Sequence, residues 1–375
     1  MDTAIRLEGL RQLLRQDGVD GAVIRRPANV AYLTGFPATP GHPRLAVVGP
    51  SRAALVAPGS AEAARAYTAA DLDVFGYAVP GATVDRVADV ELRSGEALEQ
   101  ALETVGLRGR RIGVEETQLS AYHAAVLARH GTVAPIGQRV EALRRIKDAD
   151  ELRLIRAAVA ANDAGFEAAG RAIGPGTSEF RVQAALVQAI EEAVDAPVHL
   201  LDDTNCLISG PRTAGAVGLP TSRRLEPADL MIVDINPWIR GYKADTTRTF
   251  SVGPPSAEHR RIYDTLARAL EAAERVARPG VPANAVYAAL ADTIAGAGYG
   301  AGMRGHGGHA IGLEHLERPY VIAGDAMPLA EGMVLTLEPG VYLSDVGLRL
   351  EDNYLVTADG LELLSHYTRE LVACG

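Results

Sequence analysis

Four acidic residues lie within or directly beside apolar, strand-like runs, and this arrangement most strongly restricts what the chain can fold into. They are Asp234 in LMIVDIN, Asp245 in KADTTRTF, Glu338 at the end of MVLTLE and Glu351 in GLRLED. If these runs pair into two β-hairpins, each hairpin presents one carboxylate from each of its strands. A charge held against an apolar sheet costs several kcal/mol unless it is paired or binds a cation. We therefore expect the four carboxylates to surround a cation site.

Two divalent cations would balance about four carboxylates, and one imidazole would complete a shell suited to manganese, cobalt, iron or zinc. The segment GHGGHAIG, between the two acidic pairs, offers His306 or His309 for this position. Each carboxylate alone has a simpler interpretation as a strand-edge, turn or ion-pair residue. Glu338, for example, precedes Pro-Gly, a pair common in turns. The four acidic residues together with the histidines are harder to explain without metal.

The length of the chain, 375 residues, predicts two domains, because single cores stop growing at about 250–300 residues. In the first part, strand-like runs alternate with helix-like stretches. These runs cover residues 21–26, 44–49, 53–58 and 111–115. The alternation is typical of an α/β domain.

The second part opens with a long amphipathic helix, near residues 148–173, which the polar Asn162 interrupts. The apolar residues on one face of this helix are Leu152, Ile155, Val159 and Phe166. Asp148 or Asp150 would cap the start of this helix. Further helices are predicted at 256–277 and 282–297, and strands at 230–235, 244–252, 333–338 and 347–356. Helices grouped with paired strands indicate an α+β domain.

Composition excludes several classes of partner. The chain carries 37 basic and 47 acidic residues, a formal net charge of −10, so a nucleic-acid partner is not expected. Two cysteines, Cys206 and Cys374, cannot form a disulfide framework for this length, which favours a reducing compartment. The charged N-terminal helix does not look like a signal peptide, and no apolar run is long enough to span a membrane. We expect a cytoplasmic protein.

The motifs resemble those of the pita-bread metallohydrolases, in the branch of aminopeptidase P, prolidase and creatinase. The similar segments are 230–250 and 308–320, LEPGVY (337–342), GLRLED (347–352), ANVAYLTGF (28–36) and RRIKDADELRLIRAA (144–158). They span nearly the whole chain in the family's order. The resemblance implies a creatinase/prolidase-like α/β domain over residues 1–142 and a pita-bread α+β catalytic domain over 143–375. Relatives often form dimers, so a homodimer is expected.

The resemblance also implies the roles of five residues. Asp234 would bind one metal ion, Asp245 and Glu351 would bridge two ions, and His309 and Glu338 would bind the other. The spacing of the family's pattern selects His309 over His306. The implied cofactors are two divalent ions, manganese first, with cobalt, zinc or iron as alternatives. Glu338 would take the proton of the attacking water.

Arg349, two residues before Glu351, would orient a carboxylate of the site, or it forms an ordinary ion pair. Val217 and Leu316 stand where peptidase relatives place histidines that contact the substrate. His315 is adjacent to Leu316 but would face the opposite side of a strand unless a bulge intervenes.

The carboxylate-binding arginine of the prolidases is also replaced, because Tyr320 stands at its position. Arg318 is nearby, but residues of this kind are more often surface groups. These departures predict weak hydrolysis of Xaa-Pro dipeptides, while the metal ligands remain complete.

The leading interpretation is a hydrolase of amide C–N bonds that uses two metal ions and resembles Xaa-Pro peptidases, with a small peptide as substrate. One alternative keeps the metal centre and acts on a small non-peptide amide or cyclic amidine, as ectoine hydrolase and creatinase do. The other is a binding module without catalytic activity.

Overall fold

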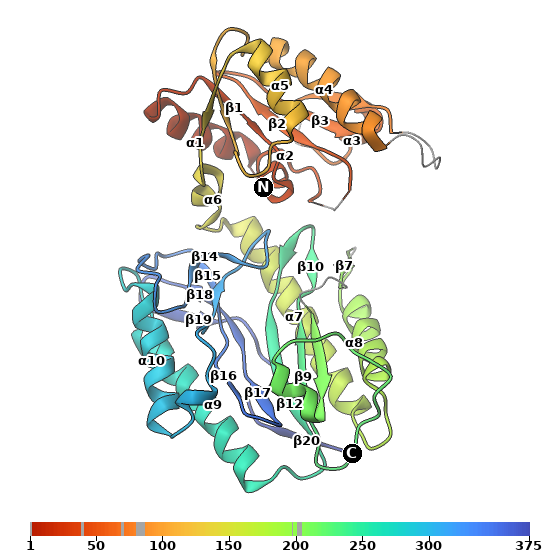
Figure 1. Ribbon diagram of the computed structural model, residues 1–375, viewed down its shortest axis with the longest axis vertical. Coiled ribbons are helices and arrows are strands. Elements are labelled where there is room, and N and C mark those ends of the chain that lie inside the picture. The colour runs from red at the N-terminus through yellow and green to blue at the C-terminus, as the bar shows by residue number, and fades with distance from the viewer. Residues whose placement is uncertain (1, 39–40, 69–70, 80–86, 197, 201–204) are drawn as a thin grey trace. The chain divides into compact units, whose positions relative to one another are not determined.

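The computed structural model describes residues 2–38, 41–68, 71–79, 87–196, 198–200 and 205–375. The chain divides into two compact units, Met1–Arg144 and Arg145–Gly375 (Figure 1). None of the helices within these described ranges has the length and apolar character that a membrane span requires.

The first unit is an α/β domain built on a mixed six-stranded sheet of order β4-β3-β2-β1-β5-β6. Its strands are β1 (Gly21–Ile24), β2 (Leu45–Val48), β3 (Ala53–Pro58), β4 (Asp73–Tyr77), β5 (Arg111–Val114) and β6 (Thr132–Pro135). The pairs β1–β5, β5–β6 and β3–β4 are parallel, and β2 is antiparallel to both its neighbours. The four predicted strands are present, and β4 and β6 were missed.

The described part of the first unit also contains helices, among them the expected N-terminal one. They are α1 (Thr3–Gln16), α2 (Pro27–Thr34), α3 (Ala61–Arg65), α4 (Val87–Thr104), α5 (Ala121–His130) and α6 (Arg139–Arg144). In α1, Leu7, Leu10 and Leu14 are buried. The segment ANVAYLTGF forms α2, which ends at Gly35 in the left-handed conformation that glycine adopts without strain.

Within its described residues, the second unit contains four long helices and four β-sheets. The helices are α7 (Ala149–Ala172), α8 (Glu179–Ala193), α9 (Ala257–Val276) and α10 (Ala283–Gly296), and α8 and α10 lie on opposite sides of the unit (Figure 1). The sheets have the orders β11-β10-β7, β20-β12-β9-β8, β14-β13-β15-β18-β19 and β16-β17. Helices α7, α9 and α10 confirm the predicted helices, while α8 and the short strands were missed.

The strands of the second unit are short, and most of them are fully buried. They are β7 (Val198–His199), β8 (Cys206–Ser209), β9 (Leu230–Ile235), β10 (Trp238–Ile239), β11 (Tyr242–Lys243), β12 (Thr246–Val252), β13 (His309–Ala310), β14 (Glu317–Tyr320), β15 (Val334–Leu337), β16 (Gly340–Tyr342), β17 (Gly347–Arg349), β18 (Asp352–Val356), β19 (Leu361–Leu363) and β20 (Val372–Cys374). The two larger apolar cores among the described residues of this unit form with α7, α8, β9 and β12 and with α9, α10, β15 and β18.

Helix α7 is capped at its start and is hydrogen-bonded to the end of strand β9. Asp148 caps the helix in a capping box with Glu151, which decides between the two candidate aspartates. Asn162, the polar residue expected to interrupt the apolar face, donates a hydrogen bond of 2.8 Å from Nδ2 to the carbonyl of Ile235. This bond ties α7 to the residue that follows Asp234.

The two acidic pairs occupy antiparallel hairpins. In the β9–β12 ladder Asp234 lies opposite Thr247, and β10 and β11 lie in the connection that leads to Asp245. In the second hairpin the predicted strand 347–356 is interrupted, so Glu351 lies between β17 and β18. Glu338 lies at the matching break between β15 and β16. Breaks in the strand pairing thus coincide with two of the acidic residues.

A buried arginine joins the two hairpins. The guanidinium of Arg248, in β12, forms an ion pair of 2.7 Å with Asp352 in β18, and the Arg248 side chain is 1% exposed. It also donates hydrogen bonds to the carbonyls of Thr247 and Glu351, at 2.9 and 2.6 Å. Two further carbonyls, of Tyr367 and Thr368, accept bonds of 2.8 Å from the same group. Arg248 therefore holds the backbone of Glu351 against β12.

We predict that Arg248→Met lowers the free energy of unfolding by about 3–5 kcal/mol, because it leaves the buried Asp352 without its full compensation. Urea unfolding measures this change. The matched control is Arg275→Ala, which removes an exposed arginine 3.9 Å from Glu271 and should cost no more than about 0.5 kcal/mol. Equal effects of the two substitutions would contradict the prediction.

Candidate metal centre

The five residues expected to bind metal come together in the second unit. Nε2 of His309 lies 3.3 Å from Oδ2 of Asp245 and 3.5 Å from Oε1 of Glu338. Carboxylate oxygens of Asp234, Asp245 and Glu351 lie within 4.8 Å of one another. The two acidic pairs and the histidine segment, far apart in sequence, thus form one cluster.

Backbone contacts fix these groups from several sides. Asn353 Nδ2 donates to the carbonyl of Asp245 at 2.6 Å, and Asn353 Oδ1 accepts from the amide of Asp245 at 3.2 Å. Gly308 (φ 141°) precedes His309, and a Cβ at this glycine would lie 2.1 Å from the carbonyl oxygen of Thr336. Only glycine permits this approach of the histidine segment to β15.

Arg349 forms an ion pair with one carboxylate of the cluster. It donates from Nη2 to Oδ2 of Asp234 at 2.5 Å and from Nε to the hydroxyl of Thr247 at 3.1 Å. The Thr247 hydroxyl in turn donates to Oε2 of Glu351 at 2.7 Å. A third bond, at 3.0 Å, joins Nη1 of Arg349 to the hydroxyl of Tyr342. These contacts account for one oxygen of Asp234 and one of Glu351.

The remaining oxygens of these two residues are the strongest indication that the cluster fits a cation. Oδ1 of Asp234 and Oε1 of Glu351 are buried and have no hydrogen-bond partner among the described residues. Buried polar atoms in native proteins nearly always have a partner, and one that lacks it indicates an unseen water or ion. Together with the imidazole of His309, these oxygens form a donor set that fits divalent metal ions.

Crowding of the carboxylates perturbs their ionisation in the metal-free protein. Burial raises the pKa of Asp234 to about 8, with Asp245 and Glu338 adding to the effect against the attraction of Arg349. Burial and the same neighbouring carboxylates raise the pKa of Glu351 well above its usual value. Metal ions would replace the protons that these groups otherwise retain.

Glu338 and His309 behave differently because charged partners outweigh burial. Burial opposes ionisation of Glu338, but the hydrogen bond and charge of His306 lower the pKa of Glu338 to about 2. Burial likewise opposes the charged form of His309, but the contact with Asp245 and the charge of Glu338 raise its pKa to about 9. Glu338 is therefore a carboxylate at neutral pH.

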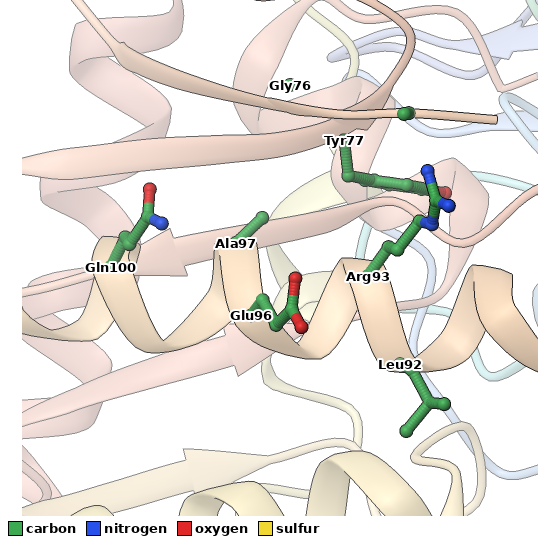
Figure 2. Close-up of a pocket in the computed structure, with 8 residues that line it drawn as sticks. Gly76, Tyr77, Leu92, Arg93, Glu96, Ala97 and Gln100 are labelled. Atoms are coloured by element: carbon green, nitrogen blue, oxygen red, sulfur yellow. The ribbon is translucent and has the colours of Figure 1, made fainter.

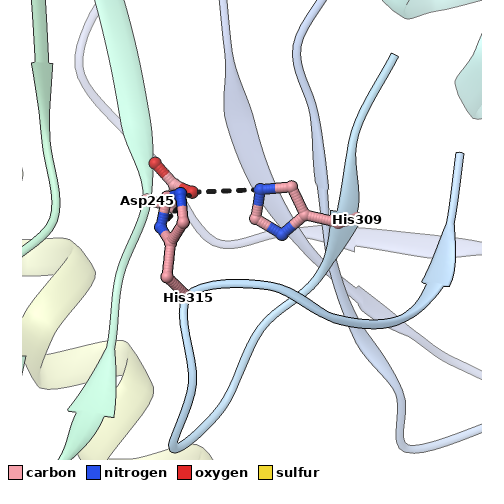
Figure 3. Close-up of side chains that lie close together, drawn as sticks. All are labelled: Asp245, His309 and His315. Atoms are coloured by element: carbon pink, nitrogen blue, oxygen red, sulfur yellow. Dashed lines mark ion pairs between the residues drawn. The ribbon is translucent and has the colours of Figure 1, made fainter. Parts of the chain in front are cut away.

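Two more histidines reach the cluster. Nε2 of His306 lies 2.9 Å from Oε1 of Glu338. Nδ1 of His315 lies 3.2 Å from Oδ2 of Asp245 (Figure 3). The expectation that His315 faces away from the site is wrong, because residues 312–316 form a bent loop and β14 begins only at Glu317. The alternation of a strand does not apply to this loop.

Val217 and Leu316, which stand where peptidase relatives place histidines, are both exposed to solvent. The side chain of Val217 is 71% exposed and that of Leu316 is 50% exposed. Val217 follows Ala216, whose carbonyl accepts a bond of 3.2 Å from Nη1 of Arg349. This contact connects the exposed Val217 segment to the arginine that orients Asp234.

Neither Tyr320, at the position expected for the carboxylate-binding arginine, nor the nearby Arg318 offers a positive charge that is free to bind a substrate. Tyr320, in β14, pairs in register with His309 and has no positive charge. The guanidinium of Arg318 forms an ion pair of 2.8 Å with the buried Asp325. Arg318 is therefore already neutralised.

Sequence reasoning missed Thr247 and Tyr342 as partners of Arg349. A signal for Thr247 was present, because it lies two positions after Asp245 and so faces the same side of an extended chain. No comparable pattern identifies Tyr342, whose position depends on the β16–β17 hairpin.

A surface hollow in the first unit differs from the candidate metal centre in the residues that line it (Figure 2). Its lining residues are Gly76, Tyr77, Ala78, Leu92, Arg93, Glu96, Ala97 and Gln100. Only one carboxylate and no histidine belong to this set, so it lacks the ligands of a metal site.

Comparison with known proteins identifies the family to which the chain belongs. Residues 153–358 match metallopeptidase family M24, and residues 6–146 match the creatinase/prolidase N-terminal domain. The chain belongs to metallopeptidase family M24 and is a hydrolytic enzyme, with a creatinase-type N-terminal domain and a pita-bread catalytic domain. The predicted fold class and family are confirmed.

Individual relatives match either nearly the whole chain or a large part of it. Peptidase YqhT of Bacillus subtilis is 29% identical over 374 residues, 98% of this chain and 99% of that protein. An Xaa-Pro dipeptidase of Pyrococcus horikoshii is 34% identical over 231 residues, 61% of this chain and 65% of that protein. The solved structure of an Xaa-Pro dipeptidase from Bacillus anthracis superposes with a TM-score of 0.86 at 25% identity, covering 99% of this chain and 100% of that one.

We predict that the free energy of unfolding of the metal-free protein falls as the pH rises from about 7 to about 9. The folded-state pKa values of Asp234, Glu351 and His309 are all raised. The folded protein therefore holds more protons than the unfolded chain in this range, and raising the pH removes that advantage. Urea unfolding of chelator-treated protein measures the slope.

The control for this pH dependence is the double variant Asp234→Asn/Glu351→Gln, which should have a shallower slope because two of the three groups no longer titrate. A wild-type stability that is constant or rises over the same range would contradict the account of the cluster.

Proposed function

We propose that this enzyme hydrolyses the amide bond of short Xaa-Pro peptides with two divalent metal ions. The observation that carries the proposal is the pair of buried carboxylate oxygens, on Asp234 and Glu351, that lack a partner within the described part of the chain. The names of the relatives, Xaa-Pro dipeptidases among them, support the peptide substrate.

The ligands in this proposal are the five clustered residues. They are Asp234, Asp245, His309, Glu338 and Glu351. Bound ions would supply Lewis-acid chemistry, which lowers the pKa of water and polarises a carbonyl group. Manganese, cobalt, zinc and iron are all compatible with carboxylate and imidazole ligands.

Glu338 would act as the general base. The hydrogen bond and charge of His306 lower the pKa of Glu338, so the group is ionised at neutral pH, the state that a proton acceptor requires. The bond from His306 to Oε1 would orient this carboxylate. Glu338 would receive the proton of the attacking water and transfer it to the leaving nitrogen of the peptide bond.

Arg304 is the residue that we propose for the substrate's terminal carboxylate. Its guanidinium lies 4.9 Å from the ring centre of Tyr342, the tyrosine bonded to Arg349. It donates to the carbonyl of Ala214 at 3.2 Å, and no carboxylate of the described chain lies within ion-pair distance. An exposed guanidinium two residues before His306 offers the bidentate geometry that carboxylates prefer.

Two alternatives differ in substrate and in activity. Because Tyr320 and Arg318 provide no free cation on β14, a small amide without a carboxylate remains the second candidate substrate. A non-catalytic binding module is disfavoured, since the family is one of metallopeptidases and the candidate ligands are all present.

We also propose a homodimer in the cytoplasm. The exposed apolar side chains of Val217 and Leu219, on one short segment, are suited to a protein contact. Cys206 and Cys374 are both free and buried, which fits a reducing compartment.

The sequence alone predicts weak hydrolysis of Xaa-Pro dipeptides, because Tyr320 replaces the carboxylate-binding arginine. Since Arg304 would supply that positive charge, we predict instead that the metal-loaded enzyme cleaves Ala-Pro and Leu-Pro and that amidation of the C-terminal carboxylate lowers kcat/KM. Arg304→Ala should reduce kcat/KM for the free dipeptides by about tenfold to a hundredfold, the range of a charge-assisted hydrogen bond, and should have little effect on the amidated ones. Steady-state kinetics with matched free and amidated substrates measure both effects. The Arg304→Lys variant should recover part of the loss.

The catalytic control is Glu338→Gln, which should lose nearly all turnover while its metal content and circular dichroism are measured in parallel. Turnover of a non-peptide amide together with inactivity on every Xaa-Pro peptide would overturn the peptide substrate. Unchanged turnover in Glu338→Gln would overturn the role of Glu338.

A further inference from the structure

The loop at residues 312–316 gives Asp245 a second imidazole neighbour. His309 approaches Oδ2 of Asp245 through Nε2 at 3.3 Å, and His315 approaches the same oxygen through Nδ1 at 3.2 Å. Figure 3 shows the two rings arriving from β13 and from the loop. Their centroids are 5.1 Å apart and their planes are tilted by 57°. Three donor atoms thus converge on one point.

The spacing of these atoms is that of ligands around a metal ion. Donor atoms about 2.0–2.1 Å from an ion, at tetrahedral or octahedral angles, lie roughly 2.9–3.4 Å from one another. Both measured separations, 3.3 and 3.2 Å, fall within this range. The three donors also lie within 4.8 Å of one another as a set.

A hydrogen bond to protein does not explain the position of His315. Nδ1 of this ring is buried, and no group in the described ranges satisfies hydrogen-bond geometry with it. A nitrogen that is close to a carboxylate oxygen yet has no proper partner is consistent with a lone pair directed at an ion. This orphaned nitrogen adds to the two unpaired oxygens of the cluster.

A buried ion pair holds the loop in place. Oε2 of Glu317 lies 3.1 Å from Nζ of Lys147, and the side chains are 7% and 1% exposed. Oε1 of Glu317 accepts a bond of 3.2 Å from the amide of Glu314, next to His315. At the other end of the loop, the carbonyl of Gly312 accepts a bond of 2.9 Å from the amide of Lys243. The imidazole is therefore presented by a fixed loop.

We infer that His315 is a sixth metal ligand and that one ion of the centre is bound by two imidazoles, those of His309 and His315. The inference rests on the proposed metal centre and goes beyond its five expected ligands. A second nitrogen donor shifts the preference of that position from manganese toward zinc or cobalt.

The test compares zinc-loaded wild type with His315→Ala and His315→Gln. X-ray absorption should count one imidazole ligand fewer per chain in both variants. Chelator competition should show that, in both variants, the protein's affinity for one of the two zinc ions falls by at least about tenfold. His366→Ala, which removes an exposed histidine, is the matched control and should match wild type in both measurements.

The outcomes separate this inference from the proposed function. Unchanged zinc affinity and imidazole count in both His315 variants, with a raised KM for peptides, would make His315 a substrate contact and overturn the inference alone. A wild-type protein that binds no zinc, cobalt or manganese would overturn the metal centre and the inference together. Circular dichroism confirms that each variant is folded.

Discussion

Mutual repulsion among four clustered carboxylates is the constraint on which the rest of the catalytic unit depends. Arg349 forms an ion pair with Asp234, and ring nitrogens of His306 and His309 lie close to a carboxylate oxygen of Glu338. These contacts leave buried oxygens of Asp234 and Glu351 without partners in the described chain. A fold that concentrates acid in this way is stable only with protons or metal ions in the cluster, and protons block the ligand atoms.

The fold brings the ligands together through two hairpins held in fixed register. Arg248 joins them by binding Asp352 and the carbonyl of Glu351, and Asn353 braces the backbone of Asp245. Helix α7 contributes through Asn162, whose apparent mismatch with its apolar face is a bond to the end of β9. The same polar residues that interrupt the hydrophobic pattern therefore set the geometry of the cluster.

The sequence predicts the fold class, the helices α7, α9 and α10 and the acidic residues, because each leaves a local pattern of spacing or burial. The position of His315 could not be predicted in this way. Alternation along a strand directs it away from the site, but the loop conformation depends on Glu317 and on Lys147, 170 residues earlier in the chain. The interrupted strand at Glu351 and the contact of Tyr342 with Arg349 likewise depend on tertiary pairing.

Anomalous X-ray scattering from crystals grown with zinc tests the central claim most directly. The account predicts two strong peaks, about 3.5–4 Å apart as in other two-metal sites, among the carboxylates of Asp234, Asp245, Glu338 and Glu351. It predicts that the imidazole of His309 contacts one of them. A zinc-soaked crystal with no peak inside this cluster would contradict the account.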